Sequence, residues 1–200
     1  QTHERIAHSL ETLRVDRASP ATFNSFRVLR LARREYVHSN VLAWLCDPRG
    51  NHGLGTSFLN LVLGEARLPC VQEDDRHVRV RREHMGDSSI VDITVSTTTA
   101  LLVIENKVDA EEGEEQTERE YQDFRPLAAG RAFAAVFLTA NGELPRRSEF
   151  IPWSYEKIWR LLGGVKCDRR VEPFLSDYRD AIVKDILEGG DHYSPMTLCK

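Results

Sequence analysis

The chain has 200 residues, of which 41% are hydrophobic and 29% charged, a composition that excludes a disordered or collagen-like protein and predicts one compact domain. No stretch approaches the roughly 18 consecutive apolar residues that a membrane span requires, and the N-terminus lacks a secretory signal, so we expect a cytoplasmic protein with no membrane partner. The first residue is Gln1, which leaves open that the chain is a piece of a longer protein.

Charge is distributed unevenly along the sequence. The net charge of −4 argues against a protein that coats nucleic acid by bulk attraction. Residues 1–82 carry a net charge of +4, residues 83–123 carry −10 and residues 124–200 carry +2. The acidic middle segment indicates a solvated acidic helix, a cation site, or both.

Several common functional motifs are missing from the sequence. The cysteines lack the spacing of zinc ligands, and we expect reduced, mostly buried thiols at Cys46, Cys70, Cys167 and Cys199. The glycines that follow His52 do not complete a nucleotide-binding fingerprint, and the sequence holds no Gly-x-Ser-x-Gly elbow of a serine hydrolase.

The N-terminal part of the chain has helical periodicity. Apolar spacing predicts a helix over residues 4–16, and the pattern from Phe23 to Asp47-Pro48 predicts one long helix or two consecutive helices. A loop over residues 49–55 and a short helix around residues 58–63 follow.

From residue 77 the hydrophobic period changes to two, which predicts β-strands. Short polar turns join the first three expected strands, so we expect antiparallel neighbours at residues 78–81, 90–95 and 101–107. A helix over residues 111–124 leads to an apolar strand over residues 132–138, which indicates a crossover and a parallel pairing. Helices over residues 154–163 and 171–188 complete the prediction.

The third expected strand ends with the strongest chemical signal. Glu105 and Lys107 are two residues apart, so their side chains point to the same face of an otherwise apolar strand. The chain has only 5 lysines against 22 arginines, which makes a lysine at this position notable. Lysine can lower its pKa when it is desolvated, whereas arginine cannot release its proton.

Asp92 lies between apolar residues on the preceding strand, where an unpaired carboxylate would be costly. If the two strands pair through the turn at residues 96–100, Asp92 lies beside Glu105, and two such carboxylates share a proton or bind a cation. Mg²⁺ or Mn²⁺ is the expected cation, with the backbone carbonyl of Asn106 as a further ligand. Such a metal activates water, and Lys107 orients that water or neutralises developing negative charge.

These segments resemble the active-site core of the PD-(D/E)xK nuclease superfamily. The resemblance is carried by Ile90-Val91-Asp92-Ile93, with Val91 in place of the proline, and by Ile104-Glu105-Asn106-Lys107. An N-terminal signature of one prokaryotic branch is matched by Glu35-x-x-His38-Ser39-Asn40, by Leu42-Ala43-Trp44-Leu45-Cys46-Asp47-Pro48 and by Asn51-His52-Gly53-Leu54-Gly55. The resemblance covers roughly residues 23–124.

The resemblance implies a restriction-endonuclease-like α/β fold, with a mixed central sheet flanked by helices. It also implies that Glu35 assists the metal and that Gln116, on the helix after the lysine strand, belongs to the site. The branch usually places a tyrosine four residues after this glutamine, whereas this chain has Glu120 there and Tyr121 next.

Other polar residues keep two interpretations. His38, one turn after Glu35, contacts a phosphate or the scissile water, or is a hydrogen-bonded helix histidine. Glu83 is a further ligand or the partner of a neighbouring arginine. The acidic helix is interpreted as a solvated face: Glu111, Glu112, Glu114, Glu115, Glu118 and Glu120.

Basic residues are the expected phosphate contacts, with a salt-bridged surface as the alternative. Arg27, Arg30 and Arg34 would share a face of the helix that carries Glu35. The others are Arg79, Arg81 and Arg82 on the first strand and Arg146 and Arg147 on a loop.

The sequence therefore predicts a metal-dependent DNA endonuclease, with a role in defence against foreign DNA as one possibility. The single domain comprises N-terminal helices over residues 1–70, a catalytic core over about 71–140 and C-terminal helices over about 150–190. The alternatives are a catalytically silent module for DNA binding or assembly, and a nuclease active only when partner domains oligomerise it. We expect a homo-oligomer or a fusion to further domains.

Overall fold

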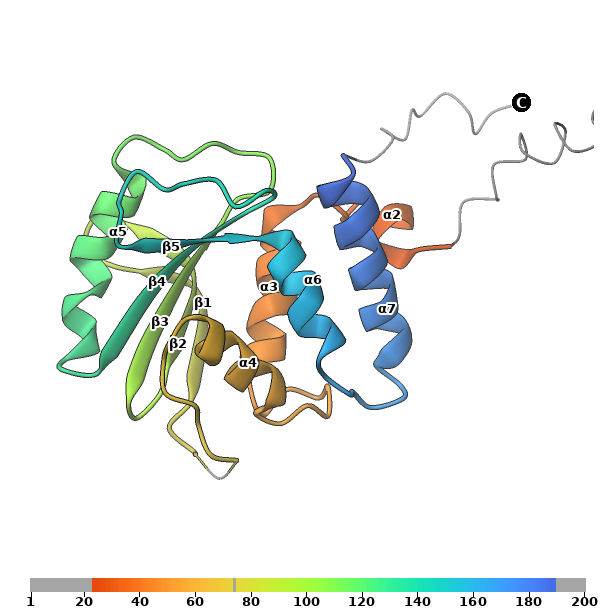
Figure 1. Cartoon of the computed structure of the whole chain (residues 1–200), viewed down its shortest axis with the longest axis horizontal. Coiled ribbons are helices and arrows are strands. Elements are labelled where there is room, and N and C mark those ends of the chain that lie inside the picture. Colours follow the sequence, from red (N-terminus) through yellow and green to blue (C-terminus); the bar gives the residue numbers. More distant parts are fainter. Residues whose placement is uncertain (1–22, 74, 190–200) are drawn as a thin grey trace, which may run out of the picture.

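The computed structural model describes residues 23–73 and 75–189 (Figure 1). The helix expected over residues 4–16 lies outside these residues. The α-helices are α2 (Ser25–Val28), α3 (Glu35–Cys46), α4 (Ser57–Glu65), α5 (Gln116–Phe124), α6 (Tyr155–Gly163) and α7 (Glu172–Ala181). A 3₁₀ turn, η1, spans Pro126–Ala128, and α7 continues into a π-helical segment, η2 (Ile182–Leu187). The strands are β1 (Arg79–Met85), β2 (Ile90–Ser96), β3 (Ala100–Asn106), β4 (Ala132–Thr139) and β5 (Phe150–Ser154).

The strands form one mixed sheet in the order β1-β2-β3-β4-β5. The first three strands are antiparallel, and β3 and β4 are parallel because α5 provides the crossover between them. This confirms the α/β fold class and both predicted pairings. The fold is that of a restriction-endonuclease-like domain, in which helices flank a mixed sheet.

The fifth strand was not predicted from the sequence. β5 has only five residues, is parallel to β4 and leads without a break into α6, so its pattern merges with that of the helix. Pro152 lies in this strand and is exposed, which is compatible with an edge position because proline cannot donate to a further strand. The opposite edge, β1, alternates exposed and half-buried residues and carries three arginines.

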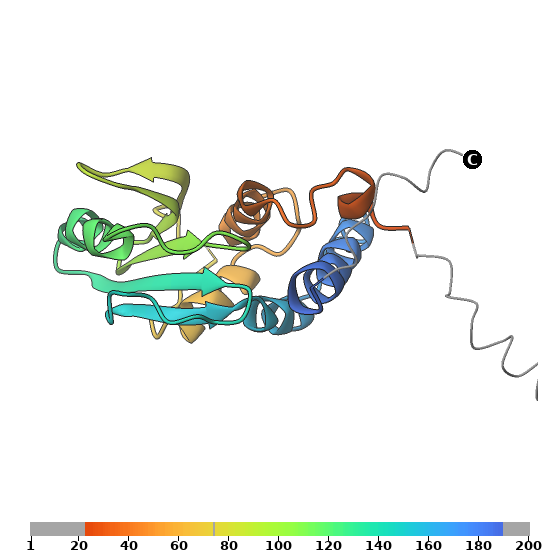
Figure 2. The ribbon, with the colours of Figure 1, turned by 90° about the horizontal axis from the view of Figure 1, so that it is seen from above.

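An apolar core lies on each face of the sheet. Phe124 of α5 packs with Val103 and Phe137 on one face. On the other face, α3, α4 and α6 cover the sheet, and this larger core continues to Tyr178 of α7 and Ile182 of η2. The molecule is consequently elongated, with α5 at one end and α2 and α7 at the other (Figures 1 and 2).

The segment from Phe23 to Pro48 forms two consecutive helices, one of the two predicted forms. The side chain of Asn24 accepts from the amides of Phe26 and Arg27 and caps α2, which is only one turn long. Arg30 then adopts a left-handed backbone conformation with φ of 56° and ends that turn before α3 begins at Glu35.

The cysteines only partly follow the expectation. Cys46 is buried, Cys167 is half-buried and Cys70 is exposed, so the prediction of mostly buried thiols is wrong for the described residues, and Cys199 lies outside them. Burial raises the pKa of the Cys46 thiol to about 12. Over residues 23–73 and 75–189, no helix is long and apolar enough to cross a membrane.

Candidate active site

The ends of β2 and β3 bring Asp92 and Glu105 together. The paired part of the two strands reaches Ile93 and Ile104, and Asp92 and Glu105 come directly after this pair. The backbone amide of Asn106 also donates to Oδ2 of Asp92 at 2.9 Å. The juxtaposition expected from the sequence is therefore present in the fold.

Lys107 lies on the same side of β3 as Glu105. Its Nζ is 3.1 Å from Oε1 of Glu105, and both side chains are largely buried. Burial by itself lowers the pKa of Lys107, but the charge and hydrogen bond of Glu105 raise it overall, with Glu35 and Asp92 adding to the effect. The lysine is thus held in its charged form beside the carboxylates.

The two carboxylates lie in a poorly solvated place. Burial raises the pKa of Asp92 above its ordinary value, although the Asn106 amide and Arg82 oppose this shift. Burial, and then the charge of Asp92, raise the pKa of Glu105 to about 7. Ionising both carboxyl groups at this place therefore costs free energy, which a nearby cation would offset.

The donor set fits a divalent, oxygen-preferring metal. Glu105 is only 3% exposed, and its Oε2 has no hydrogen-bond partner among the residues that the structure describes. Two adjacent carboxylates, one with a free oxygen, suit Mg²⁺ or Mn²⁺. Within residues 23–73 and 75–189 no three His, Cys, Asp or Glu side chains form a ready-made metal cluster, so backbone oxygen or water would have to complete the coordination.

Glu35 reaches the site from the first turn of α3. Its Oε1 accepts from three successive backbone amides after β3, those of Val108 at 2.9 Å and of Asp109 and Ala110 at 3.2 Å. The charge of Glu35 also contributes to the raised pKa of Asp92. The carboxylate thus holds the chain that follows the lysine beside the site.

Gln116 and Glu120 enter the site from the start of α5. The Gln116 side-chain amide donates to Oε1 of Glu105 and, at 2.9 Å, to Oε1 of Glu120. Glu120 is fully buried, and burial, followed by the charge of Glu105, raises its pKa to about 9. The interpretation of Glu120 as part of a solvated face is therefore wrong. The helical spacing of Thr117, Glu120 and Phe124, all buried, is the signal that would have found it.

His38 is not a nucleic-acid contact in this structure, and the alternative of a hydrogen-bonded helix histidine holds. The ring is fully buried, with Nε2 at 2.9 Å from the carbonyl oxygen of Ala32 and Nδ1 at 3.2 Å from the hydroxyl of Tyr178. Burial lowers the pKa of His38 to about 4, so the imidazole is neutral.

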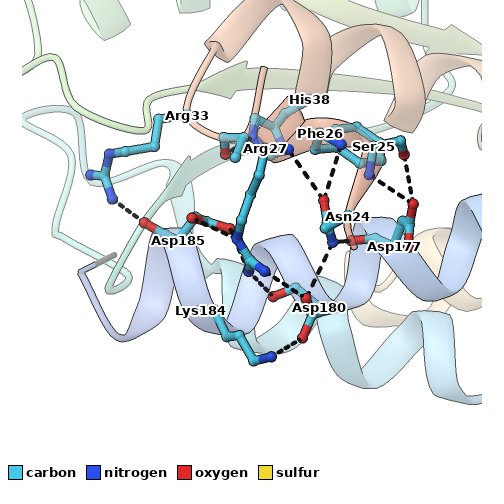
Figure 3. Close-up of polar contacts among 11 residues, drawn as sticks. Asn24, Ser25, Phe26, Arg27, Arg33, His38, Asp177, Asp180, Lys184 and Asp185 are labelled. Carbon is cyan, nitrogen blue, oxygen red and sulfur yellow. Dashed lines mark hydrogen bonds and ion pairs between the residues drawn. The ribbon is translucent and has the colours of Figure 1, made fainter. Parts of the chain in front are cut away.

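The predicted arginine stripe before Glu35 is not formed, because the helix is interrupted. Arg27 lies on α2 and bonds Asp180 and Asp185 of the C-terminal helical segment (Figure 3). Arg30 lies in the turn and Arg34 at the N-terminal cap of α3, and both are exposed. Arg33 donates hydrogen bonds to the side chain of Asp109 and to the backbone oxygen of Asp185. The contact with Asp109 links the turn before α3 to the loop that Glu35 holds.

The arginines of β1 point in different directions. Arg81 is exposed, whereas Arg82 is half-buried and donates its Nε to the backbone oxygen of Asp92 at 3.0 Å and a terminal nitrogen to Asn40. Glu83 is exposed and lies 3.8 Å from Arg82, in agreement with a partner of a neighbouring arginine. Arg147 is likewise occupied, by Glu118 and by the ring of Tyr121.

Comparison with known proteins agrees with this geometry. No curated protein sequence matches the chain significantly. The family model of the PD-(D/E)XK nuclease superfamily matches residues 23–188, a span that includes α3, the whole sheet and the C-terminal helices. Nucleases of this superfamily generally use divalent metals. The chain belongs to the PD-(D/E)XK nuclease superfamily.

Proposed function

We propose that the protein is a DNA endonuclease that depends on Mg²⁺ or Mn²⁺. The observation that carries the proposal is the convergence of Asp92, Glu105 and Lys107 at the ends of β2 and β3, with Lys107 only 3.1 Å from Glu105. Family membership supports hydrolysis of phosphodiester bonds.

Asp92 and Glu105 would hold the metal, with Glu35 and the backbone carbonyl of Asn106 assisting. The bound metal would lower the pKa of a water molecule and stabilise charge on the phosphate. Lys107 holds a positive charge beside this position and orients the attacking water, and Gln116 fixes the Glu105 carboxylate.

The exposed arginines supply the contacts to the DNA backbone in this proposal. Arg82 is occupied by Asp92 and Asn40, and Arg147 by Glu118. The candidates that remain exposed are Arg30, Arg34, Arg79, Arg81 and Arg146. Contacts of this kind neutralise phosphates and make binding sensitive to salt. They position the nucleic acid and carry no sequence information.

The test incubates the purified chain with supercoiled plasmid in Mg²⁺, in Mn²⁺ and in chelator. Asp92→Ala and Lys107→Ala should abolish metal-dependent nicking, whereas Asp87→Ala, a matched change at an exposed carboxylate on the β1–β2 hairpin, should retain it. Wild-type rates in both site variants would refute the assignment. Salt-sensitive DNA binding without cleavage by the folded wild type would favour the silent module or a nuclease activated by partner domains.

A further inference from the structure

The side chain of Asn106 occupies the middle of a buried hydrogen-bond network. It lies between Glu105 and Lys107 in the chain and therefore points to the opposite face of β3, into the core covered by α3 and α6. The residue is 1% exposed. Its surroundings are thus protein groups rather than water.

Every polar group of this side chain has a partner. Nδ2 donates to Oγ of Ser39 at 2.9 Å and to the backbone oxygen of Glu35 at 3.2 Å. Oδ1 accepts from the hydroxyl of Tyr155 at 2.8 Å. A reversed amide would set its oxygen against the backbone carbonyl oxygen of Glu35, so only one orientation satisfies the network.

The network joins three parts of the chain that are far apart in the sequence. Tyr155 is the first residue of α6 and is fully buried. Ser39 and Glu35 belong to α3, the helix whose carboxylate holds the loop after β3. The backbone amide of Asn106 also donates to Asp92. One residue therefore connects both helices to Asp92 and is flanked by Glu105 and Lys107.

We infer that Asn106 is a positioning residue for the metal-binding edge of the sheet, and that the hydroxyl of Tyr155 holds it in register. The inference rests on the proposed metal-dependent nuclease. Hydrogen bonds behind the groups that bind a metal set their orientation, and losing them typically weakens metal affinity or activity by about 10- to 100-fold.

Two buried tyrosines allow a matched comparison. Tyr155 and Tyr178 are both fully buried and both contact the ring of His38, with centroid distances of 5.2 and 5.5 Å. Only the Tyr155 hydroxyl reaches Asn106, since that of Tyr178 lies 3.2 Å from Nδ1 of His38. Tyr155→Phe and Tyr178→Phe therefore each remove one buried hydroxyl from the same core. Only Tyr155→Phe removes a hydrogen bond to Asn106.

The experiment measures Mn²⁺ binding by calorimetry on the full chain, together with plasmid cleavage and melting temperature. Tyr155→Phe should bind Mn²⁺ about 10- to 100-fold more weakly than Tyr178→Phe, with a matching rise in the metal concentration needed for cleavage. Equal Mn²⁺ affinity in the two variants, while the wild type binds and cleaves, would overturn the inference and leave the proposed function standing.

Two further variants complete the test. Ser39→Ala removes a different partner of Asn106 and should also weaken Mn²⁺ binding, so the inference can be judged even where Tyr155→Phe does not fold. Unchanged Mn²⁺ affinity in Ser39→Ala would count against the network. Asp92→Ala removes a proposed metal ligand and gives the reference value for lost Mn²⁺ binding. A folded wild type that neither binds Mn²⁺ nor cleaves would overturn the proposed function and the inference with it.

Discussion

Nζ of Lys107 and Oε1 of Glu105 are 3.1 Å apart at the end of β3. The same carboxylate oxygen accepts from Gln116, whereas Oε2 of Glu105 has no partner among the described residues. One oxygen of Glu105 is thus committed to the protein, and the other is available to a metal.

Lys107→Arg should lower the initial rate of plasmid nicking by about 100-fold or more, because a small misplacement of an orienting group is costly. The charge is retained, but the planar guanidinium cannot occupy the position of the compact ammonium that orients the attacking water. Lys157→Arg, on α6 and paired with Glu65, is the control and should cleave normally. Full activity in Lys107→Arg would show that only a positive charge is needed at this place.

Glu35→Ala should reduce both stability and cleavage. The change leaves three amides after β3 without their acceptor, which we expect to lower the free energy of unfolding by about 1–3 kcal/mol in urea titrations. Glu35→Gln keeps an oxygen acceptor, so it should recover much of the stability while cleavage stays impaired. Cleavage at the wild-type rate in Glu35→Gln would remove this carboxylate from the metal site.

Arg81→Ala and Arg82→Ala should have different effects, although the residues are neighbours. Arg81 is exposed, so its loss should weaken DNA binding and reduce the salt dependence of that binding. Arg82 supports Asp92 and Asn40, so its loss should lower the free energy of unfolding by about 1–3 kcal/mol. Binding titrations at several salt concentrations and urea unfolding measure the two quantities. A loss of stability in Arg81→Ala together with weakened DNA binding in Arg82→Ala would contradict the orientation of these two side chains on β1.

Glu120 should make the metal-free protein less stable as the pH rises from 7 to 9. The folded protein keeps this carboxyl protonated up to a pKa of about 9, whereas the unfolded chain loses the proton near 4.5. Stability present at low pH is therefore lost as the pH rises, by at most about 1.4 kcal/mol per pH unit. Urea unfolding in chelator should show this slope, and Glu120→Gln should flatten it. Equal slopes in the two proteins would assign the effect to another group.

The sequence predicted the sheet core well because the period changes sharply at its boundaries. Val78 and Val80 alternate with arginines, and Asp92 and Glu105 interrupt apolar strands, so the pairing of β2 with β3 and its consequence for the carboxylates could be anticipated. The parallel pairing of β3 with β4 followed from the length of the connection through α5.

Burial of polar residues could not be predicted in the same way. His38, Asn106 and Glu120 are all at most 1% exposed, and their partners come from segments distant in the sequence. The left-handed turn at Arg30 ends α2, a helix that packs against α7, and no local pattern reports that contact. Tertiary contacts therefore decided which polar residues belong to the site.

The two edges of the sheet have a consequence for aggregation. β1 carries arginines at its outer positions, and β5 has Pro152 where another strand would need an amide donor. Repulsion between like charges at one edge and the missing donor at the other both discourage strand addition between molecules. Pairing of several copies through these two edges is therefore disfavoured, and the protein should resist growth into extended fibrils at high concentration.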